Sequence, residues 1–121
     1  MATSTIPVQD KIEQISFTLS TTGAQYFTTE YNMCEWDGRN LHCYLRLHAI
    51  ASVPVNTEIM IGTLSNVTLG LTYPGTVASA SNSSMLGSFV VTSSGAVYIN
   101  LFGTVTNGNN ILLSGEMRKK H

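Results

Sequence analysis

Strict alternation of apolar and polar residues over residues 40–49 is the clearest pattern in this chain. The apolar positions are Leu41, Cys43, Leu45, Leu47 and Ala49. The polar positions are Asn40, His42, Tyr44, Arg46 and His48. A period of two predicts a β-strand with one face in the core and one polar outer face.

Shorter alternating runs occupy residues 59–61, 89–91, 97–102 and 111–118, and no run has a strong helical period. Turn dipeptides separate the runs at Asp37-Gly38, Ser94-Gly95 and Asn107-Gly108, and they predict three hairpins. We expect residues 65–75, which include a proline and two glycines, to form a long loop with one short irregular strand. The predicted fold class is all-β, an antiparallel β-sandwich or jelly-roll-like barrel of about eight strands.

The first hairpin also predicts a register. If residues 37–40 form a four-residue loop, Trp36 lies opposite Leu41 and Cys34 lies opposite Cys43, whereas a two-residue loop shifts the pairing by two and leaves the faces unchanged. With either loop, the side chains that point into the core are Cys34, Trp36, Cys43 and Leu45. Two cysteines are too few for a disulfide framework or a zinc site. The pair could form a cross-strand disulfide, but we favour two buried thiols, because free cysteine packs as a small hydrophobe.

Length and charge limit the possible functions. The 121 residues fit one domain, which we place at residues 15–118 between an N-terminal segment (1–14) and a basic tail (119–121). A formal net charge of −1 leaves no excess of cations for nucleic acid, and no apolar stretch approaches a membrane span of ~20 residues. The first ten residues do not resemble a secretory signal, so we expect folding in a cytoplasm. Charged residues make up only 11%, which suggests an oligomer or attachment to a larger assembly.

The polar face of residues 42–48 is the first candidate binding site. His42, Tyr44, Arg46 and His48 offer an aromatic ring and directional hydrogen-bond donors, which suit a sugar, although a solvent-exposed or subunit-facing strand would look the same. The two histidines lie about 20 Å apart along a strand, too far to share a metal ion. Asn66 and Tyr73 in the predicted long loop are further candidates. We expect no metal and no cofactor.

Catalytic groupings are weak. Glu35 and Asp37 flank Trp36 like a pair of glycosidase carboxylates, but so small a domain seldom forms the groove that a saccharide substrate needs. No nucleophile elbow and no phosphate-binding glycine loop occurs. We therefore expect a binding protein rather than an enzyme, and we keep a small cell-wall hydrolase as an alternative.

The order of short motifs resembles a known group of proteins. The motifs are Tyr31-x4-Trp36, Leu41-x-Cys43-x-Leu45-x-Leu47, Ile61-Gly62-Thr63-Leu64, Tyr73-Pro74, Ser93-Ser94-Gly95-x-Val97-x-Ile99 and Asn110-Ile111-x-Leu113-Ser114-Gly115. Over residues 29–117 the chain is similar to the C-terminal head domain of tail receptor-binding and baseplate proteins from phages of Gram-positive bacteria. It departs from that group at Ser65, where proline is usual, and at Met117, where an aromatic is usual.

The resemblance implies more than the composition does. It implies a β-sandwich head that assembles as a homotrimer at the tail tip of the virion, after synthesis in the host cytoplasm. The implied partners are other phage tail or baseplate proteins and a host cell-wall polysaccharide or teichoic acid. A purely structural baseplate or tail-decoration protein is the alternative within the same group. None of the group's saccharide-contacting residues can be assigned to a position in this chain.

Overall fold

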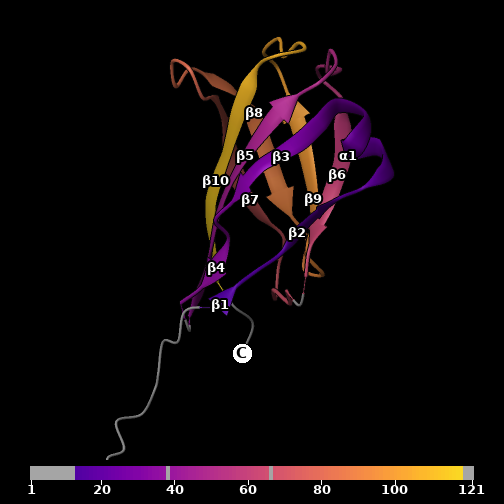
Figure 1. Ribbon diagram of the computed structural model, residues 1–121. Helices are drawn as coiled ribbons and strands as arrows, with labels where there is room; N and C mark the ends of the chain where they lie inside the picture. Colours follow the sequence, from indigo (N-terminus) through magenta and orange to yellow (C-terminus); the bar gives the residue numbers. More distant parts are fainter. Residues whose placement is uncertain (1–12, 38, 66, 119–121) are drawn as a thin grey trace, which may run out of the picture.

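Ten strands and one short helix make up the part of the chain that the structure describes, which is residues 13–37, 39–65 and 67–118 of a computed structural model (Figure 1). The strands are β1 (Glu13–Gln14), β2 (Phe17–Leu19), β3 (Phe27–Asn32), β4 (Glu35–Trp36), β5 (Asn40–Ala49), β6 (Glu58–Leu64), β7 (Tyr73–Ser79), β8 (Met85–Val91), β9 (Ala96–Leu101) and β10 (Asn110–Arg118). The helix is α1 (Thr21–Tyr26). All ten strands belong to one antiparallel sheet. The sheet curls into a nearly closed barrel of eight strands, so the expected all-β fold is confirmed in its barrel form.

The strand order around the barrel is β5-β10-β7-β8-β9-β6-β2, and β3 and β4 follow one another along the free edge of β5. Strands β7, β8 and β9 are joined by hairpins, and β10 returns to lie beside β7, which is a Greek key. The hairpin expected at Asn107-Gly108 is therefore wrong, because β9 and β10 do not pair. Gly108 does turn the chain, with φ +96°, but a turn reverses the chain only locally. Here the turn lies in the connection between β9 and β10, and β10 pairs with β5 and β7 instead of β9.

A single N-terminal segment closes the barrel. β1 pairs with β4, and β2 pairs with β6 at the opposite edge of the sheet. Between them Ile15 donates its amide to the carbonyl of Cys34 and is only 3% exposed. We call residues 13–19 the closing segment. It covers both sheet edges, which would otherwise leave unpaired backbone groups open to another chain.

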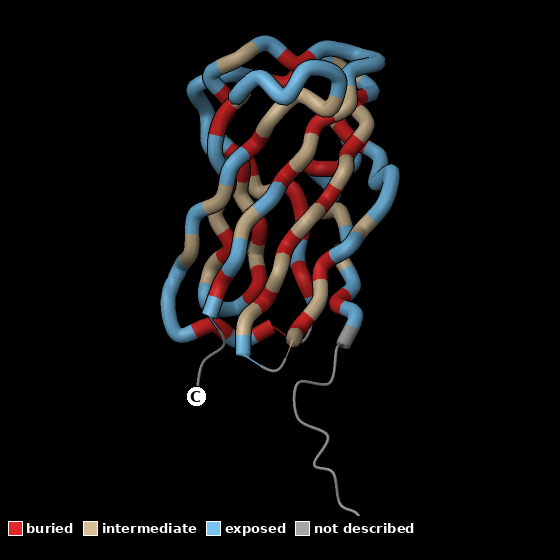
Figure 2. The backbone as a smooth tube through the Cα atoms, turned by 90° about the vertical axis from the view of Figure 1, so that its left-hand side faces the viewer, coloured by how far each residue is buried: buried red, intermediate tan, exposed pale blue. Residues whose placement is uncertain are grey.

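Alternation along the strands places the core inside the barrel (Figure 2). The inward residues of β5 are almost fully buried, and those of β10 continue the same layer at Ile111 and Leu113. Among the described residues, no polar or charged side chain is buried. The barrel interior is thus a packed apolar core, and polar chemistry is left to the outer surface.

Part of the expected long loop is a strand. Residues 73–75 belong to β7, so the short strand expected within residues 65–75 is the beginning of a longer strand. Pro74 is tolerated because β7 pairs with β10 only over residues 76–79, and there Pro74 has β8 alone as a neighbour. Gly75 leaves room for Phe89, whose ring would lie 2.3 Å from an added Cβ.

Helix α1 is the element that the sequence pattern did not predict. The Ser20 hydroxyl accepts a hydrogen bond from the amide of Gly23 and caps the first turn. Gly23 then faces β6 so closely that a Cβ there would lie 2.0 Å from the carbonyl oxygen of Ile61. Close backbone approach, rather than helical periodicity, holds these six residues in place.

We expect Gly23→Ala to lower the free energy of unfolding by about 1–3 kcal/mol, because the new methyl group must push α1 off β6. Urea unfolding measures the loss, with Gln25→Ala on the exposed side of the same helix as the control. Alanine favours helices over glycine by about 1 kcal/mol, so an unchanged or higher stability of Gly23→Ala would contradict the close packing of α1 on β6.

Candidate functional site

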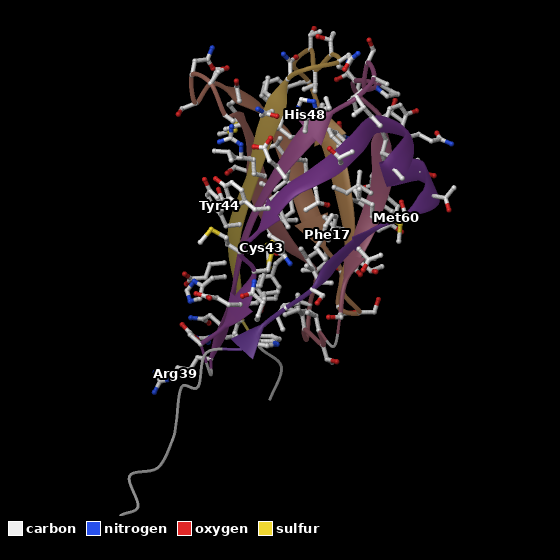
Figure 3. All side chains as sticks on the ribbon, in the orientation of Figure 1. Phe17, Arg39, Cys43, Tyr44, His48 and Met60 are labelled. Atoms are coloured by element: carbon white, nitrogen blue, oxygen red, sulfur yellow. The ribbon has the colours of Figure 1, made fainter. Side chains whose placement is uncertain are left out.

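The outward side chains of β5 form the centre of the candidate site. We call the outer β5 face the side chains of His42, Tyr44, Arg46 and His48 together with the residues that contact them from neighbouring elements. All four predicted residues alternate with buried ones, so the structure brings them onto one side of one strand. Tyr44 and His48 lie along this face in Figure 3, with Tyr44 near its middle.

A pair of tyrosines forms the middle of the outer β5 face. The ring centroids of Tyr31 and Tyr44 lie 6.3 Å apart with an interplanar angle of 16°. Tyr31 reaches Tyr44 because β3 pairs with β5 so that Tyr31 lies opposite Arg46, one outward position further along. Tyr31 is 41% exposed and the neighbouring Met33 is 56% exposed. The result is an apolar surface with flat rings on an otherwise polar side of the barrel.

Arg46 borders this pair of rings. Its guanidinium carbon lies 5.9 Å from the ring centroid of Tyr31, and its Nε forms an ion pair with Glu30. A register shift between Thr29 and Tyr31 makes this possible, because the β-bulge leaves both Glu30 and Tyr31 exposed on the same strand. A hydrogen bond to Tyr31 and the charge of Glu30 raise the pKa of Arg46. The guanidinium is therefore held beside the rings from two sides.

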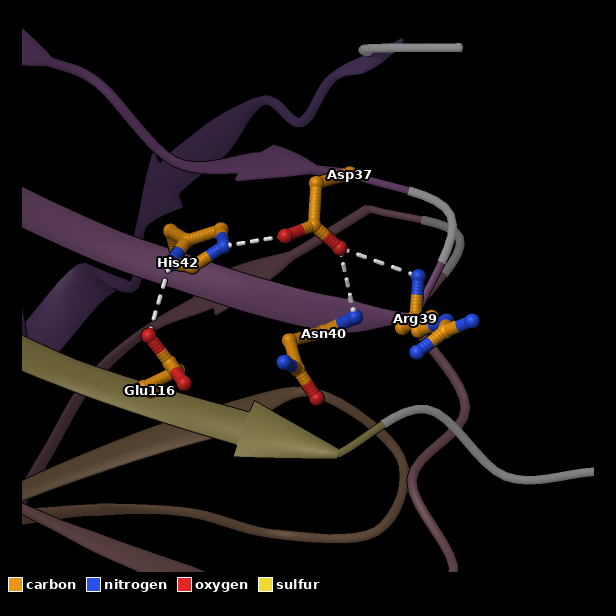
Figure 4. A network of polar contacts seen from close by, with 5 residues as sticks. All are labelled: Asp37, Arg39, Asn40, His42 and Glu116. Carbon is orange, nitrogen blue, oxygen red and sulfur yellow. Dashed lines mark hydrogen bonds and ion pairs between the residues drawn. The ribbon is translucent and has the colours of Figure 1, made fainter. Parts of the chain in front are cut away.

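His42 occupies the other end of the face, between two carboxylates (Figure 4). Its Nε2 lies 2.6 Å from Asp37 Oδ2, and its Nδ1 lies 3.0 Å from Glu116 Oε2 on β10. Only the imidazolium has a hydrogen on each ring nitrogen and can donate to both. The pKa of His42 is raised, chiefly by its hydrogen bond to Asp37 and also by the charges of Glu116 and Glu35.

Asp37 also holds the turn into β5. Its Oδ1 accepts hydrogen bonds from the backbone amides of Arg39 and Asn40 at 3.0 and 2.8 Å. These bonds, that of Asn40 first, together with His42, hold the pKa of Asp37 far below its usual range. Both carboxylate oxygens of Asp37 thus have partners within the protein. These contacts give Asp37 a structural role, whether or not it acts with Glu35 as the hydrolase alternative supposes.

The remaining candidates lie elsewhere. His48 Nδ1 donates to Asn110 Oδ1 at 2.7 Å, which ties the far end of the face to β10. Tyr73 lies on the same side of β7 as the buried Val77 and packs, partly buried, against the core. It therefore does not join the outer β5 face. Asn66 lies outside the described residues. Of the predicted loop site, Tyr73 alone is described, and it lies apart from the face.

Sequence reasoning missed Tyr31, Glu30, Met33 and Glu116 as members of this face. Tyr31 and Met33 could have been found, because the predicted pairing of Trp36 with Leu41 extends back along the strand and places them opposite Arg46 and Tyr44. Glu30 could not, because strict alternation would turn it away from Tyr31 and only the bulge brings both to Arg46. Glu116 required the pairing of β10 with β5, which no local pattern indicates.

Comparison with known proteins adds no family: no protein-family model, no curated protein and no solved structure matches this chain. Within the described residues, no group of three or more His, Cys, Asp or Glu side chains is arranged to hold a metal ion. The one helix found there is too short to cross a membrane. The outer β5 face is thus judged on its own geometry.

The His42 ion pairs predict a specific pH dependence. Because the folded-state pKa of His42 is raised, the stability that the imidazolium contributes is present below the unfolded pKa of about 6.5 and is lost as pH rises through the folded pKa. We expect the stability advantage of the wild type over His42→Gln, measured by urea unfolding, to be full below about pH 6.5 and to shrink as the pH rises above it.

An NMR titration of the His42 ring tests whether Asp37 is the main cause of its raised pKa. Asp37→Asn keeps an oxygen for the turn but removes the charge, so it should bring the pKa of His42 back toward its ordinary value. Glu58→Gln, on β6, serves as the remote control. A His42 pKa at or below about 6.5 in the wild type would refute the imidazolium.

Proposed function

We propose that this chain is a non-catalytic glycan-binding barrel whose binding site is the outer β5 face. The observation that supports it best is the stacked pair of the exposed Tyr31 and the half-buried Tyr44, with Arg46 held against Tyr31. Together with the motif resemblance, this leads us to propose the role of a receptor-binding head at a phage tail tip, which adsorbs to glycan on the host surface.

The chemistry of the face suits a sugar ring. The C–H face of a pyranose is apolar and packs on flat aromatic rings, while its hydroxyl groups need directional donors and acceptors at the edge. Tyr31 and Tyr44 supply the rings, and Arg46 and Glu30 supply the donors and the acceptor at their side. All four residues are positioned by paired strands rather than by a loop, so little ordering is needed when a ligand binds.

The charge around the face selects among glycans. Four of the seven acidic residues of the chain belong to it, namely Glu30, Glu35, Asp37 and Glu116. Two cations set among them, Arg46 and His42, are already paired with carboxylates, and Arg39 and Arg118 lie at the end of the face next to His42. Such a surface disfavours a polyanion and tolerates neutral or amine-bearing sugars. We therefore propose a neutral or amino-sugar cell-wall polysaccharide, rather than teichoic acid, as the ligand.

Replacing Tyr44 with alanine should weaken binding to that polysaccharide at least about tenfold, or ~1.4 kcal/mol, because it removes half of the stacked pair. Tyr98→Ala is the matched control, because Tyr98 faces outward on β9 at another side of the barrel and should bind like the wild type. Isothermal titration with purified wall polysaccharides from Gram-positive bacteria measures both variants.

Three outcomes would contradict the proposal. Equal losses in Tyr44→Ala and Tyr98→Ala would place binding elsewhere. Preferential binding of teichoic acid would contradict the charge argument. Failure to bind any polysaccharide or whole cell would favour the purely structural role in a baseplate. Turnover of a wall polysaccharide that is lost in Glu35→Gln would instead establish the hydrolase alternative.

Assembly as a homotrimer belongs to the same proposal. Val55, Met85 and Phe102 are 40%, 53% and 63% exposed at one end of the barrel. Backbone hydrogen bonds bring their chain segments together: the amide of Asn56 donates to the carbonyl of Leu101, and the amide of Phe102 donates to the carbonyl of Leu86. Val55, Phe102 and Met85 are each at or next to one of these bonded residues. Burying such side chains against copies of the chain would remove apolar surface from water.

Light scattering at micromolar concentration should give three times the 13.1 kDa mass of the chain. Phe102→Ser should shift the population toward monomer, whereas Leu71→Ser, at a similarly exposed leucine in the β6–β7 connection, should not. A wild-type monomer at this concentration would count against the trimer and against the tail-tip role that it supports.

A further inference from the structure

Two thiols lie in contact in the core beside the closing segment. Cys34 Sγ and Cys43 Sγ are 3.1 Å apart, and the two residues are 0% and 2% exposed. Both are free thiols in the structure, as expected, and they are among the residues whose inward orientation the register predicted. Neither residue has a part in the outer β5 face, so this pair needs an explanation of its own.

We propose that Cys34 and Cys43 form a redox site that a disulfide oxidant, such as glutathione disulfide, converts into a cross-strand disulfide. The two thiols lose two protons and two electrons, and one S–S bond forms between them. The glutathione S–S bond breaks, and the oxidant takes up the electrons and protons as two molecules of glutathione. The exchange passes through a mixed disulfide on the first cysteine to react.

The backbone register supports this bond. Met33 donates its amide to the carbonyl of Tyr44, and Glu35 pairs with His42, so Cys34 and Cys43 lie directly opposite each other between these pairs. The amide of Cys34 bonds to the side chain of Asn32 rather than to Cys43, as expected of a non-hydrogen-bonded pair. In such pairs the Cα atoms lie about 4.5 Å apart, which is within the range that disulfides span.

The two thiols are not equivalent. The hydrogen bond between the sulfurs lowers the pKa of Cys34 and raises that of Cys43, and burial opposes ionisation of both. Cys34 is thus the thiolate that attacks the oxidant, and Cys43 is the thiol that resolves the mixed disulfide. Other groups that could ionise, such as His42 and Tyr44, lie on the opposite face of β5.

Local opening gives the oxidant access. Cys34 lies under the closing segment. The two-residue pairing of β1 with β4, the hydrogen bond from Ile15 to Cys34 and two side-chain hydrogen bonds, from Asn32 to Ile15 and from Gln14 to Asn32, hold the segment to this edge. Short paired elements at a sheet edge open more readily than central strands. Once formed, the disulfide ties Cys34, beside β4, covalently to β5, so the edge that the closing segment covers can no longer separate from the sheet.

The test begins from the unfolded chain, so that burial cannot prevent the reaction. The full chain is refolded from urea in a buffer of reduced and oxidised glutathione, then alkylated under denaturing conditions and weighed by mass spectrometry. We expect a monomeric chain that is lighter than the reduced form by two hydrogens and has no alkylated cysteine. Treatment of this oxidised form with dithiothreitol should lower its melting temperature by several degrees, because the cross-link constrains the unfolded state.

Two variants separate the pair from general thiol chemistry. Cys34→Ser should retain one alkylatable thiol at Cys43, and Ile15→Ala should speed oxidation of the folded, reduced protein by loosening the closing segment. Two free thiols after oxidative refolding, a glutathione adduct of the wild type that persists at equilibrium in place of the disulfide, or an oxidised form that melts below the reduced form would each overturn the proposal.

Discussion

The register between β5 and the strand segment before it determines most of what is distinctive in this molecule. Asp37 sets it, because its carboxylate binds the amides of Arg39 and Asn40 and so makes a turn that places Trp36 opposite Leu41. From there the pairing runs without a shift back to Tyr31. A slip of one residue would exchange the two faces of the strand.

Opposite faces of the same pairing therefore have different tasks. The inward side of β4 and β5 contributes Trp36 and the two cysteines to the core. The outward side presents Tyr31 and Tyr44 to solvent and sets Arg46 beside them. Because the barrel interior is filled with apolar side chains, a ligand meets polar groups only on the outer surface. A rigid, strand-borne surface fits a protein that recognises a repeating polymer from outside rather than enclosing a small molecule.

Local patterns predicted the parts of this structure that depend on neighbouring residues. The period-two run of residues 40–49 predicted β5 and its two faces. The turn at Asp37 predicted that Cys34 and Cys43 point into the core, and its four-residue form places them opposite each other, as observed. Features that depend on distant residues escaped. The bulge that turns Glu30 toward Arg46, the approach of Gly23 to β6 and the placement of β10 between β5 and β7 are all tertiary. Asn107-Gly108 shows the difference, since its turn exists but the strands beside it have other partners.

Mapping of a bound glycan by NMR tests the central claim most directly. Backbone amide shifts of the full chain would be followed while a neutral Gram-positive wall polysaccharide, cut to short oligosaccharides, is added. The account predicts that the perturbed amides cluster at Tyr31, Tyr44 and Arg46, with the amides of β8 and β9 unchanged. Perturbations centred on β8 and β9, or none at millimolar oligosaccharide, would contradict a glycan site on the outer β5 face.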